Sequence, residues 1–258
     1  MASQEQKAAA FQALHEGEPF VIPNPWDAGS ARVLEALGFQ ALATTSSGFA
    51  FTLGRADGGA SVGDVVAHVA ALVGATDLPI SVDLENGYDD PAHAIQRVAE
   101  AGAVGGSIED YDPSGRIYEL PQAVERLTAA VEAARALPFP FTLTGRAENH
   151  IRDNADLDDT IARLQAYEAA GADVLYAPGL ATLDEIRAVC DAVTKPVNVH
   201  AVRDLTFAQT AEAGAQRVSV GGALTWTAVG AFAEAALAIR DQGDFSQLGS
   251  GGDWFQPA

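Results

Sequence analysis

Leu78-Pro-Ile-Ser-Val-Asp-Leu-Glu-Asn-Gly-Tyr88 is the stretch of sequence that decides the fold. It opens with an apolar run, and because proline is tolerated at the first residue of a strand, the run predicts a β-strand that begins at Pro79. Asp83 and Glu85 follow two residues apart, which is one side-chain period of a strand, so both carboxylates point the same way. The stretch therefore predicts a strand that brings two acids to one place.

The same pattern recurs along the chain in two alternating versions. In one version, proline opens the strand, as at Pro19, Pro79, Pro140 and Pro196. In the other version, glycine ends a helix in the left-handed conformation and the strand follows, as at Gly38, Gly102, Gly171 and Gly214. The two kinds of marker alternate strictly, which predicts eight strands.

Alanine-rich segments with helical periodicity separate these strands, at residues 28–37, 91–101, 121–136, 157–170, 183–193 and 223–240. Alternating β and α units predict an α/β fold, a closed parallel (β/α)8 TIM-type barrel, with an open doubly wound sheet as the alternative. We expect residues 1–258 to form a single domain. Within it, 241–258 is a C-terminal tail whose Trp254 and Phe255 dock on a neighbouring subunit, with disorder as the alternative.

Composition narrows the class of protein. The 258 residues carry a formal charge of −20, which argues against nucleic acid or an anionic membrane as a partner. No apolar stretch approaches the roughly 20 residues that span a bilayer, and the N-terminus lacks the basic-then-apolar order of a signal peptide. Cys190 is the one cysteine, so the chain cannot form an internal disulfide, which suits the cytoplasm. Its position on a predicted helix indicates core packing. We expect a cytoplasmic protein.

In such a barrel the chemistry lies at the carboxyl ends of the strands. The residues expected there are Asn24, Asp27, Thr44 to Gly48, Asp83, Glu85, Glu109, Asp110, Arg146, Glu148, Tyr176, Asn198, His200 and Ser219 to Gly222. Lys195 precedes its strand and Lys7 precedes the first strand. A Schiff-base aldolase, which needs a lysine in the site, is therefore unlikely on this pattern.

Carboxylates at two neighbouring strand ends point to a bound cation. Asp83, Glu85 and Glu109 would repel one another without one, and oxygen ligands favour a hard ion such as Mg²⁺ or Mn²⁺. The alternative is that they are ordinary solvated or helix-capping carboxylates. Asp110 directly follows Glu109, so its side chain should point the opposite way.

Other strand-end residues are candidates for binding an anionic substrate. Arg146, the one basic residue at a predicted strand end, suits a bidentate clamp on a carboxylate or phosphonate, with a structural ion pair to Glu148 or Glu109 as the alternative. Thr45, Ser47 and Gly48 belong to a run of hydroxyl and backbone N–H donors suited to an anion, or to an ordinary polar turn. Asn198 and His200 share one strand face. The remaining histidines, His15, His68, His93 and His150, are expected to be inert or weak candidates.

Taken together, these residues are recognisable. The chain resembles the isocitrate lyase/phosphoenolpyruvate mutase superfamily along nearly its whole length. The matching phrases are Asn24-Pro-Trp-Asp-Ala-Gly-Ser-Ala-Arg, Thr44-Thr-Ser-Ser-Gly, Leu53-Gly-Arg-Ala-Asp, Val82-Asp-Leu-Glu-Asn-Gly-Tyr, Ile108-Glu-Asp and Gly145-Arg-Ala-Glu.

The resemblance implies a Mg²⁺-dependent barrel enzyme acting on 2-oxo-carboxylates or their phosphonate analogues. By position, Asp83 resembles the direct metal ligand, with Asp57, Glu85 and Glu109 holding metal-bound waters. Thr45, Ser47, Gly48, Arg146 and Asn198 resemble substrate-binding residues, with Arg146 and Glu109 in catalytic roles. Family members are usually tetramers that exchange a C-terminal helix, so we expect a homotetramer.

The chain departs from the family in one loop. Carbon–carbon lyases carry a Lys-Lys/Arg-Cys-Gly-His loop after the fourth strand, whereas this chain reads Asp110-Tyr-Asp-Pro-Ser-Gly-Arg-Ile-Tyr118, with no cysteine, lysine or histidine. They also place a glutamate after strand six, where this chain has Tyr176-Ala-Pro-Gly. Tyr118 is predicted as a replacement proton donor, with Tyr111 and Arg116 as the other donors available in the loop.

These residues predict a Mg²⁺-dependent lyase or decarboxylase acting on a small 2-oxo-dicarboxylate or 2-hydroxy acid through an enolate. A carbon–phosphorus mutase or hydrolase for phosphonopyruvate-like substrates is the first alternative. A catalytically silent barrel that binds a 2-oxo acid is the second. The leaving group is not predictable, because it depends on the loop that this chain has rewritten.

Overall fold

The computed structural model describes residues 2–152 and 154–249 and confirms the predicted barrel. Eight parallel strands pair in the order β1-β10-β9-β8-β7-β4-β3-β2. One backbone bond, from Ala43 N–H to the Pro23 carbonyl (3.1 Å), links the two ends of this sheet and nearly closes it. The strands are β1 (Phe20–Ile22), β2 (Leu42–Ala43), β3 (Ile80–Asp83), β4 (Gly105–Glu109), β7 (Thr142–Arg146), β8 (Val174–Tyr176), β9 (Val197–His200) and β10 (Arg217–Ser219).

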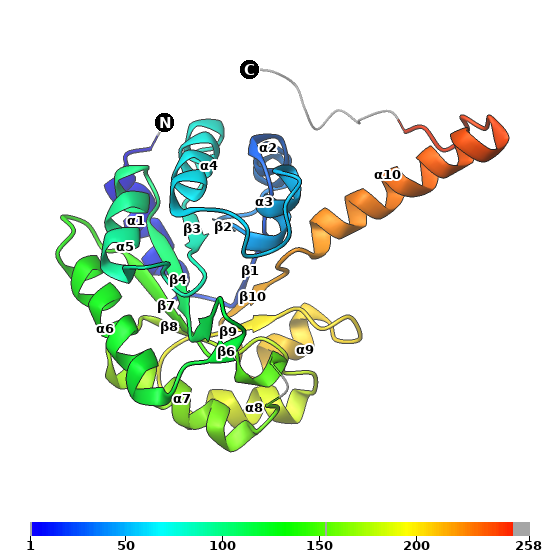
Figure 1. Cartoon of the computed structure of the whole chain (residues 1–258). Helices are drawn as coiled ribbons and strands as arrows, with labels where there is room; N and C mark the ends of the chain where they lie inside the picture. Colours follow the sequence, from blue (N-terminus) through cyan, green and yellow to red (C-terminus); the bar gives the residue numbers. More distant parts are fainter. Residues whose placement is uncertain (1, 153, 250–258) are drawn as a thin grey trace.

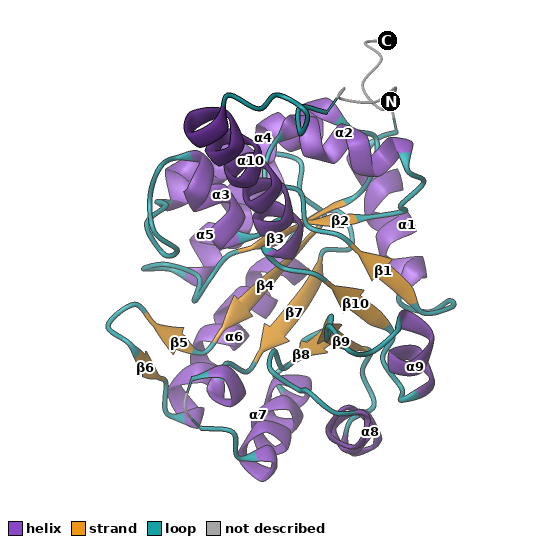
Figure 2. Ribbon diagram, turned by 90° about the vertical axis from the view of Figure 1, so that its right-hand side faces the viewer, coloured by secondary structure: helices purple, strands orange, loops and turns teal. Residues whose placement is uncertain are grey.

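Helices surround the strands, as Figure 2 shows. Most begin at a side-chain cap, for example Ser61, Asp90 and Thr182, whose oxygens accept a hydrogen bond from a backbone N–H of the first turn. The helices are α1 (Gln4–Leu14), α2 (Ala28–Ala36), α3 (Ser46–Thr52), α4 (Val62–Ala75), α5 (Pro91–Glu100), α6 (Leu120–Arg135), α7 (Leu157–Ala169), α8 (Leu183–Ala192), α9 (Phe207–Glu212) and α10 (Ala223–Gln242), with a 3-10 turn η1 (Asn149–Ile151).

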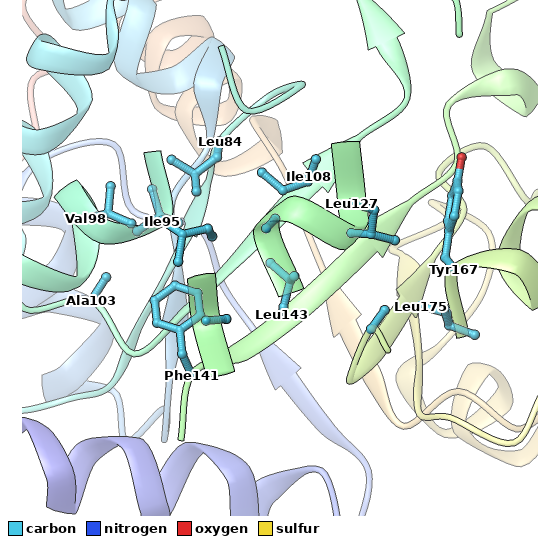
Figure 3. Packing of buried hydrophobic residues seen from close by; sticks show 14 of the residues in the cluster. Leu84, Ile95, Val98, Ala103, Ile108, Leu127, Phe141, Leu143, Tyr167 and Leu175 are labelled. Carbon is cyan, nitrogen blue, oxygen red and sulfur yellow. The ribbon is translucent and has the colours of Figure 1, made fainter. Parts of the chain in front are cut away.

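The main apolar core lies between the strands and the helices that cover them. Figure 3 shows Leu84, Ile95, Phe141, Leu143 and Tyr167 packed in this layer. A smaller cluster lies where α1 packs on the amino ends of the strands, around Phe11, Phe20, Ile22, Ala41 and Val104. A Cβ on Gly105 would come within 2.7 Å of the Phe11 ring, so this close approach requires glycine. Helix α1 therefore closes the bottom of the barrel.

A buried polar network centred on Asp110 lies directly after β4, on the side of the strand that faces the helices. Its Oδ2 accepts hydrogen bonds from Arg163 Nη1 (2.9 Å) and Tyr167 Oη (2.5 Å), and its Oδ1 accepts one from the Glu148 N–H (2.7 Å). Because side chains alternate along a strand, Asp110 points away from the lumen that Glu109 faces. The predicted opposition of these two acids is confirmed.

The loop after β4 forms a small antiparallel hairpin, β5 (Tyr111–Asp112) and β6 (Arg116–Ile117). It holds Tyr111 against Arg152, whose guanidinium carbon lies 3.8 Å from the ring centroid. The hairpin follows β4 at the carboxyl end of the barrel, beside the predicted acids.

Helix α10 leaves the barrel and extends away from it (Figure 1). Large apolar side chains are exposed along it, including Trp226 (48%), Leu237 (46%) and Phe232 (74%). The predicted tail, 241–258, begins in the last turn of α10, and Trp254 and Phe255 lie outside the described residues. Within residues 2–152 and 154–249, no helix combines the length and apolar character needed to cross a membrane.

Candidate active site

Three strands bring the predicted acids and arginine together at the carboxyl rim. Asp83 ends β3, Glu109 ends β4, and Arg146 ends β7 directly opposite Glu109 in the strand register. Arg146 Nη1 lies 3.3 Å from Glu109 Oε2 and 3.7 Å from Asp83 Oδ2. Arg146 therefore pairs with the acids at the centre of this rim.

Glu148 fixes the orientation of the Arg146 side chain through an ion pair to its Nε. Its carboxylate is fully buried, accepts a hydrogen bond from Arg146 Nε, and pairs with Arg152 Nη2 at 2.9 Å. Its backbone N–H is held by Asp110. Arg146 therefore forms both of the structural ion pairs that the sequence suggested, one with Glu148 and one with Glu109. Its guanidinium group still points toward the rim.

The acids outnumber the cations at this rim, and burial together with their mutual repulsion raises the pKa of two of them. Burial raises the pKa of Glu85 to about 7, and repulsion from Asp83 and Asp57 adds to the shift. Burial also raises the pKa of Glu109 well above its ordinary value, despite the opposing attraction of Arg146. Bringing a second positive charge to these carboxylates would therefore be favourable.

The loop that carries Glu85 is strained. Glu85 (φ 50°) and Tyr88 (φ 57°) both occupy the left-handed region, which is uncommon for residues other than glycine. Non-glycine residues in this region cluster at functional sites, where the surroundings hold them in place. The strain at Glu85 supports a functional role for this loop.

The donor set suits a hard cation, although the acids are not closely gathered. Asp57, Glu85 and Glu109 line one outer cavity of about 350 Å³, together with Arg146 and Arg152. No three His, Cys, Asp or Glu side chains among the described residues lie close enough to hold a metal ion as they stand. Every candidate ligand nevertheless supplies oxygen, the donor type that suits a hard ion such as Mg²⁺ or Mn²⁺.

The predicted donors after β2 surround the start of α3. Thr45 caps this helix, and its Oγ1 lies 3.2 Å from Ser47 Oγ. The Ser46 N–H donates to Asp83 Oδ2 (3.3 Å), which joins this segment to the acids. A Cβ on Gly48 would lie 2.6 Å from Thr225 Oγ1 and 2.7 Å from Thr45 Cγ2, so the position accepts only glycine.

A narrower inner cavity of about 60 Å³ continues from this rim into the lumen of the barrel. Asp83 and Arg146 line it at the rim, and Tyr176, Asn198 and Arg217 line it along the neighbouring strands β8, β9 and β10. The guanidinium carbon of Arg146 lies 5.2 Å from the Tyr176 ring centroid. Asn198 is buried, donates to Ser219 Oγ (3.0 Å) and accepts from Arg217 Nε (2.8 Å). The substrate-binding prediction for Asn198 thus falls on a residue of this cavity.

Tyr118 lies apart from both cavities. Its ring packs in the main core, and its hydroxyl accepts a hydrogen bond from Asn86 Nδ2 (2.8 Å). Its carbonyl is held by Arg163. The structure therefore does not bring Tyr118 to the acids and Arg146, whereas it does bring Tyr176.

Sequence reasoning missed several residues near the site. Arg217 begins β10, two residues before Ser219, and the strand period could have placed it on the same inward face. His15, expected to be inert, lies 3.1 Å from Arg217 Nη1 through its Nε2. His68, also expected to be inert, lines a small cavity with Asp83 and Glu85 and stacks on Phe49. No local sequence signal marks either histidine.

A wider hollow of about 880 Å³ lies at the other end of the barrel. Residues before the strands line it, including Pro140, Lys195 and the exposed pair of Arg135 with Asp173. Catalytic residues of these barrels come from the carboxyl ends of the strands. We therefore place the candidate site at the rim, despite the smaller cavities there.

Comparisons with known proteins agree with the fold. A family model described as phosphoenolpyruvate phosphomutase matches residues 11–240. A crystal structure from Burkholderia cenocepacia J2315, provisionally assigned as a lyase/mutase, is 52% identical with a TM-score of 0.93, covering 97% of this chain and 95% of its own.

Two curated relatives have named activities. The 2-methylisocitrate lyase of Shewanella oneidensis (strain MR-1) is 31% identical, covering 72% of this chain and 67% of the lyase. The oxaloacetate decarboxylase of Paraburkholderia xenovorans (strain LB400) is 30% identical, covering 74% of this chain and 67% of the decarboxylase.

The architecture and the rim define the class: a (β/α)8 barrel that gathers acids and an arginine at the carboxyl ends of β3, β4 and β7. Within that class, the chain belongs to the isocitrate lyase/phosphoenolpyruvate mutase superfamily. Because members of this superfamily are lyases and mutases, the family supports an enzyme without specifying its reaction.

Proposed function

We propose that this chain is a Mg²⁺-dependent lyase or decarboxylase that acts on a small 2-oxo-dicarboxylate or 2-hydroxy acid through an enolate. One observation carries the proposal: Arg146 lies 3.3 Å from Glu109 and 3.7 Å from Asp83 at the mouth of a narrow cavity. An arginine beside hard-cation ligands suits an oxygen that gains negative charge when a bond at the neighbouring carbon breaks.

Each rim residue then has a role. Asp83, with Asp57, Glu85 and Glu109 through waters, would hold Mg²⁺ or Mn²⁺, which supplies positive charge to the oxygens of a 2-oxo acid. Arg146, held by Glu148, donates hydrogen bonds to the substrate carboxylate. Thr45, Ser47 and Gly48 supply further donors at the start of α3.

The proton donor is the least constrained role. The Tyr176 phenol carries a proton at neutral pH, although burial raises its pKa and so makes it a weaker acid than an exposed tyrosine. Tyr176 lines the inner cavity, whereas Tyr118, the residue predicted for this role, does not. We therefore propose Tyr176 for the role and keep Tyr118 as the alternative.

The sequence of the β5–β6 hairpin supports a second candidate reaction, at a carbon–phosphorus bond. Residues 110–118 contain no cysteine, lysine or histidine, and carbon–phosphorus chemistry on phosphonopyruvate-like substrates has no need of the lyase cysteine. A barrel that binds a 2-oxo acid without turnover is also compatible with this loop.

A substrate panel separates these functions. The full chain is incubated with Mg²⁺ and oxaloacetate, 2-methylisocitrate, 2,3-dimethylmalate or phosphonopyruvate, and the products are followed by proton and phosphorus NMR. We expect a carbon–carbon bond to be cleaved in at least one carboxylate. Turnover of phosphonopyruvate alone would overturn the lyase proposal, and Mg²⁺-dependent binding of oxalate with no turnover would favour the silent alternative.

We also propose a cytoplasmic homotetramer in which α10 packs against a neighbouring copy. Phe232 is 74% exposed on a helix that extends from the barrel, and such apolar surface is usually covered by a partner. Sedimentation velocity of the full chain tests this assembly, and a monomer at micromolar concentration would contradict it.

A further inference from the structure

Arg217 is a buried cation whose partners among the described residues carry no charge. Its side chain is 5% exposed in the lumen of the barrel. Nε donates to Asn198 Oδ1 (2.8 Å), Nη2 donates to Thr144 Oγ1 (3.1 Å), and Nη1 lies 3.1 Å from His15 Nε2. These contacts use three of the five N–H groups that a guanidinium carries.

His15 contributes an acceptor and no charge. Its Nδ1 lies 2.8 Å from the Phe11 carbonyl, so Nδ1 carries the hydrogen and Nε2 is free to accept from Arg217. Burial, with a further contribution from Arg217, lowers the pKa of His15 to about 3, which keeps the ring neutral. Burial also lowers the pKa of Arg217 to about 10, as expected for a cation without an acid nearby.

Buried charges are usually paired, because removing an ion from water without a partner is costly. In the described part of the chain no Asp or Glu forms an ion pair with Arg217, although the protein carries a formal charge of −20. Arg146, in the same cavity, pairs with three acids. A partner for Arg217 is therefore missing from the side chains that surround it.

The inner cavity leads from the rim to this cation. Arg146, Tyr176, Asn198 and Arg217 are register neighbours on β7, β8, β9 and β10, and all four line the cavity. Three strand spacings place Arg217 ~14 Å from Arg146 along the wall, and nearer across the lumen. The lining also includes the hydroxyl groups of Ser81, Ser107 and Ser219, where barrels of this kind usually place Val, Ile or Leu, beside the apolar residues Ile22, Ala43 and Val82.

The cavity has room for a small anionic group. Its volume is about 60 Å³, and a single water needs only about 10–15 Å³ measured in this way. A carboxylate or phosphonate group that enters from the rim would therefore fit between Arg217 and the serine hydroxyl groups of the lining.

We propose that Arg217 is the counterion for a second anionic group of the substrate, a carboxylate or phosphonate that enters the inner cavity while the other end of the molecule is held at the rim. The inference rests on the proposed function and adds a specificity determinant to it. Arg146 and the acids would hold the end that becomes the enolate, and Arg217 would select dianions over monoanions.

Matched ligands test the selection without requiring turnover. Binding to the full chain with Mg²⁺ is measured by calorimetry for malate, for 2-hydroxy-3-phosphonopropionate, and for 2-hydroxybutyrate, in which a methyl group replaces the second anion. Oxalate reports on the rim alone. Because a hydrogen bond to a charged group contributes severalfold more than a neutral one, we expect a dianion to bind roughly tenfold to hundredfold more tightly than 2-hydroxybutyrate.

Arg217→Met should abolish that preference and leave oxalate binding unchanged. Arg187→Met, which removes a half-exposed arginine paired with Asp184, is the matched control and should change neither. If Arg217→Met fails to fold by circular dichroism, Arg217→Gln replaces it, because the amide keeps a hydrogen-bond donor without the charge and should also abolish the preference. The larger loss, for malate or for the phosphonate, identifies which anion the cavity takes.

The outcomes separate the two proposals. Equal loss of malate, 2-hydroxybutyrate and oxalate binding would show that Arg217 only supports the structure, and an unchanged preference would equally overturn the inference. Oxalate binding without any preference for dianions would overturn the inference and leave the proposed function standing. A preference for dianions without Mg²⁺-dependent oxalate binding would support the inference and overturn the proposed function. No binding of any of these ligands would overturn both.

Discussion

Two buried arginines share one cavity and have opposite surroundings. Arg146, on β7, is paired with Asp83, Glu109 and Glu148, and these carboxylates raise its pKa although burial opposes them. Arg217, on β10, contacts an amide, a hydroxyl and a neutral imidazole, and burial lowers its pKa.

The difference divides the barrel into two halves. On β3, β4 and β7, the acids already exceed the positive charge of Arg146, so this half favours a cation. On β8, β9 and β10, the one charged side chain that lines the inner cavity is Arg217, so this half favours an anion. A substrate whose two ends differ in this way would be held in a single orientation across the lumen.

The largest expected effect comes from the acid half. Asp83→Asn keeps the shape of the side chain and removes the charge that is predicted to hold the metal directly. We expect Mg²⁺-dependent oxalate binding, measured by calorimetry, to weaken more than roughly hundredfold, beyond what the loss of outer residues of a metal site usually costs. Asp77→Asn, at an exposed aspartate that contacts Lys7, is the control. Binding that survives Asp83→Asn undiminished would refute the metal assignment.

The neutral state of His15, which lies beside Arg217, predicts a pH dependence of stability. The pKa of His15 is about 3 in the folded chain and about 6.5 when unfolded. Below pH 6.5 the unfolded chain therefore binds a proton that the folded chain does not, so stability is full above this pH and falls as the pH drops toward 3. At pH 5 the loss from His15 is about 2 kcal/mol.

Urea unfolding at pH 8 and pH 5 measures this loss. His15→Gln keeps an acceptor for Arg217 and should remove about 2 kcal/mol of the pH-dependent change. The variant retains the contribution of His68, whose pKa burial lowers to about 4, so part of the change should remain. A variant with the full pH dependence of the original chain would show that His15 is not the neutral partner of Arg217.

Asn198→Asp would give Arg217 an acidic partner, as Arg146 already has, and so remove the difference between the two arginines. The amide oxygen already accepts from Arg217 Nε at 2.8 Å, so the carboxylate would form an ion pair without movement. The gain from pairing exceeds the cost of burying one more acid only modestly, so we expect about 1.5 kcal/mol of added stability at pH 8. The measurement is urea unfolding, with Asn149→Asp, at a buried asparagine bonded to Thr160, as the control. Destabilisation by Asn198→Asp would indicate that Arg217 is already neutralised.

The acid half was predictable from sequence, whereas in the other half Tyr176, Asn198 and Ser219 were predicted as strand-end residues but Arg217 was not. Asp83, Glu109 and Arg146 directly end apolar runs, and parallel strands must bring such ends to one rim. Arg217 is the first residue of its strand and not the last. It reaches the cavity because its side chain points into the lumen and because β10 pairs with β9 so that Arg217 lies beside Asn198. His15 reaches it because α1 packs under the barrel, a tertiary contact that no local pattern encodes. The helix at residues 223–240 was predicted from its periodicity, whereas its departure from the barrel was implied only by the family resemblance, through the exchanged C-terminal helix.

The smallest expected effect distinguishes the two tyrosines. Tyr118 lies outside the lumen, where its hydroxyl bonds Asn86, whereas Tyr176 stands between the two halves, with its ring beside Arg146. Tyr118→Phe removes one buried hydrogen bond and should cost about 1 kcal/mol of stability in urea unfolding, with little change in turnover. Tyr176→Phe is the matched variant and should lower turnover of whichever substrate the panel identifies, while oxalate binding persists. If Tyr118→Phe lowers turnover and Tyr176→Phe does not, the proton donor lies on the hairpin side of the rim, and the division of the barrel into two halves does not extend to proton transfer.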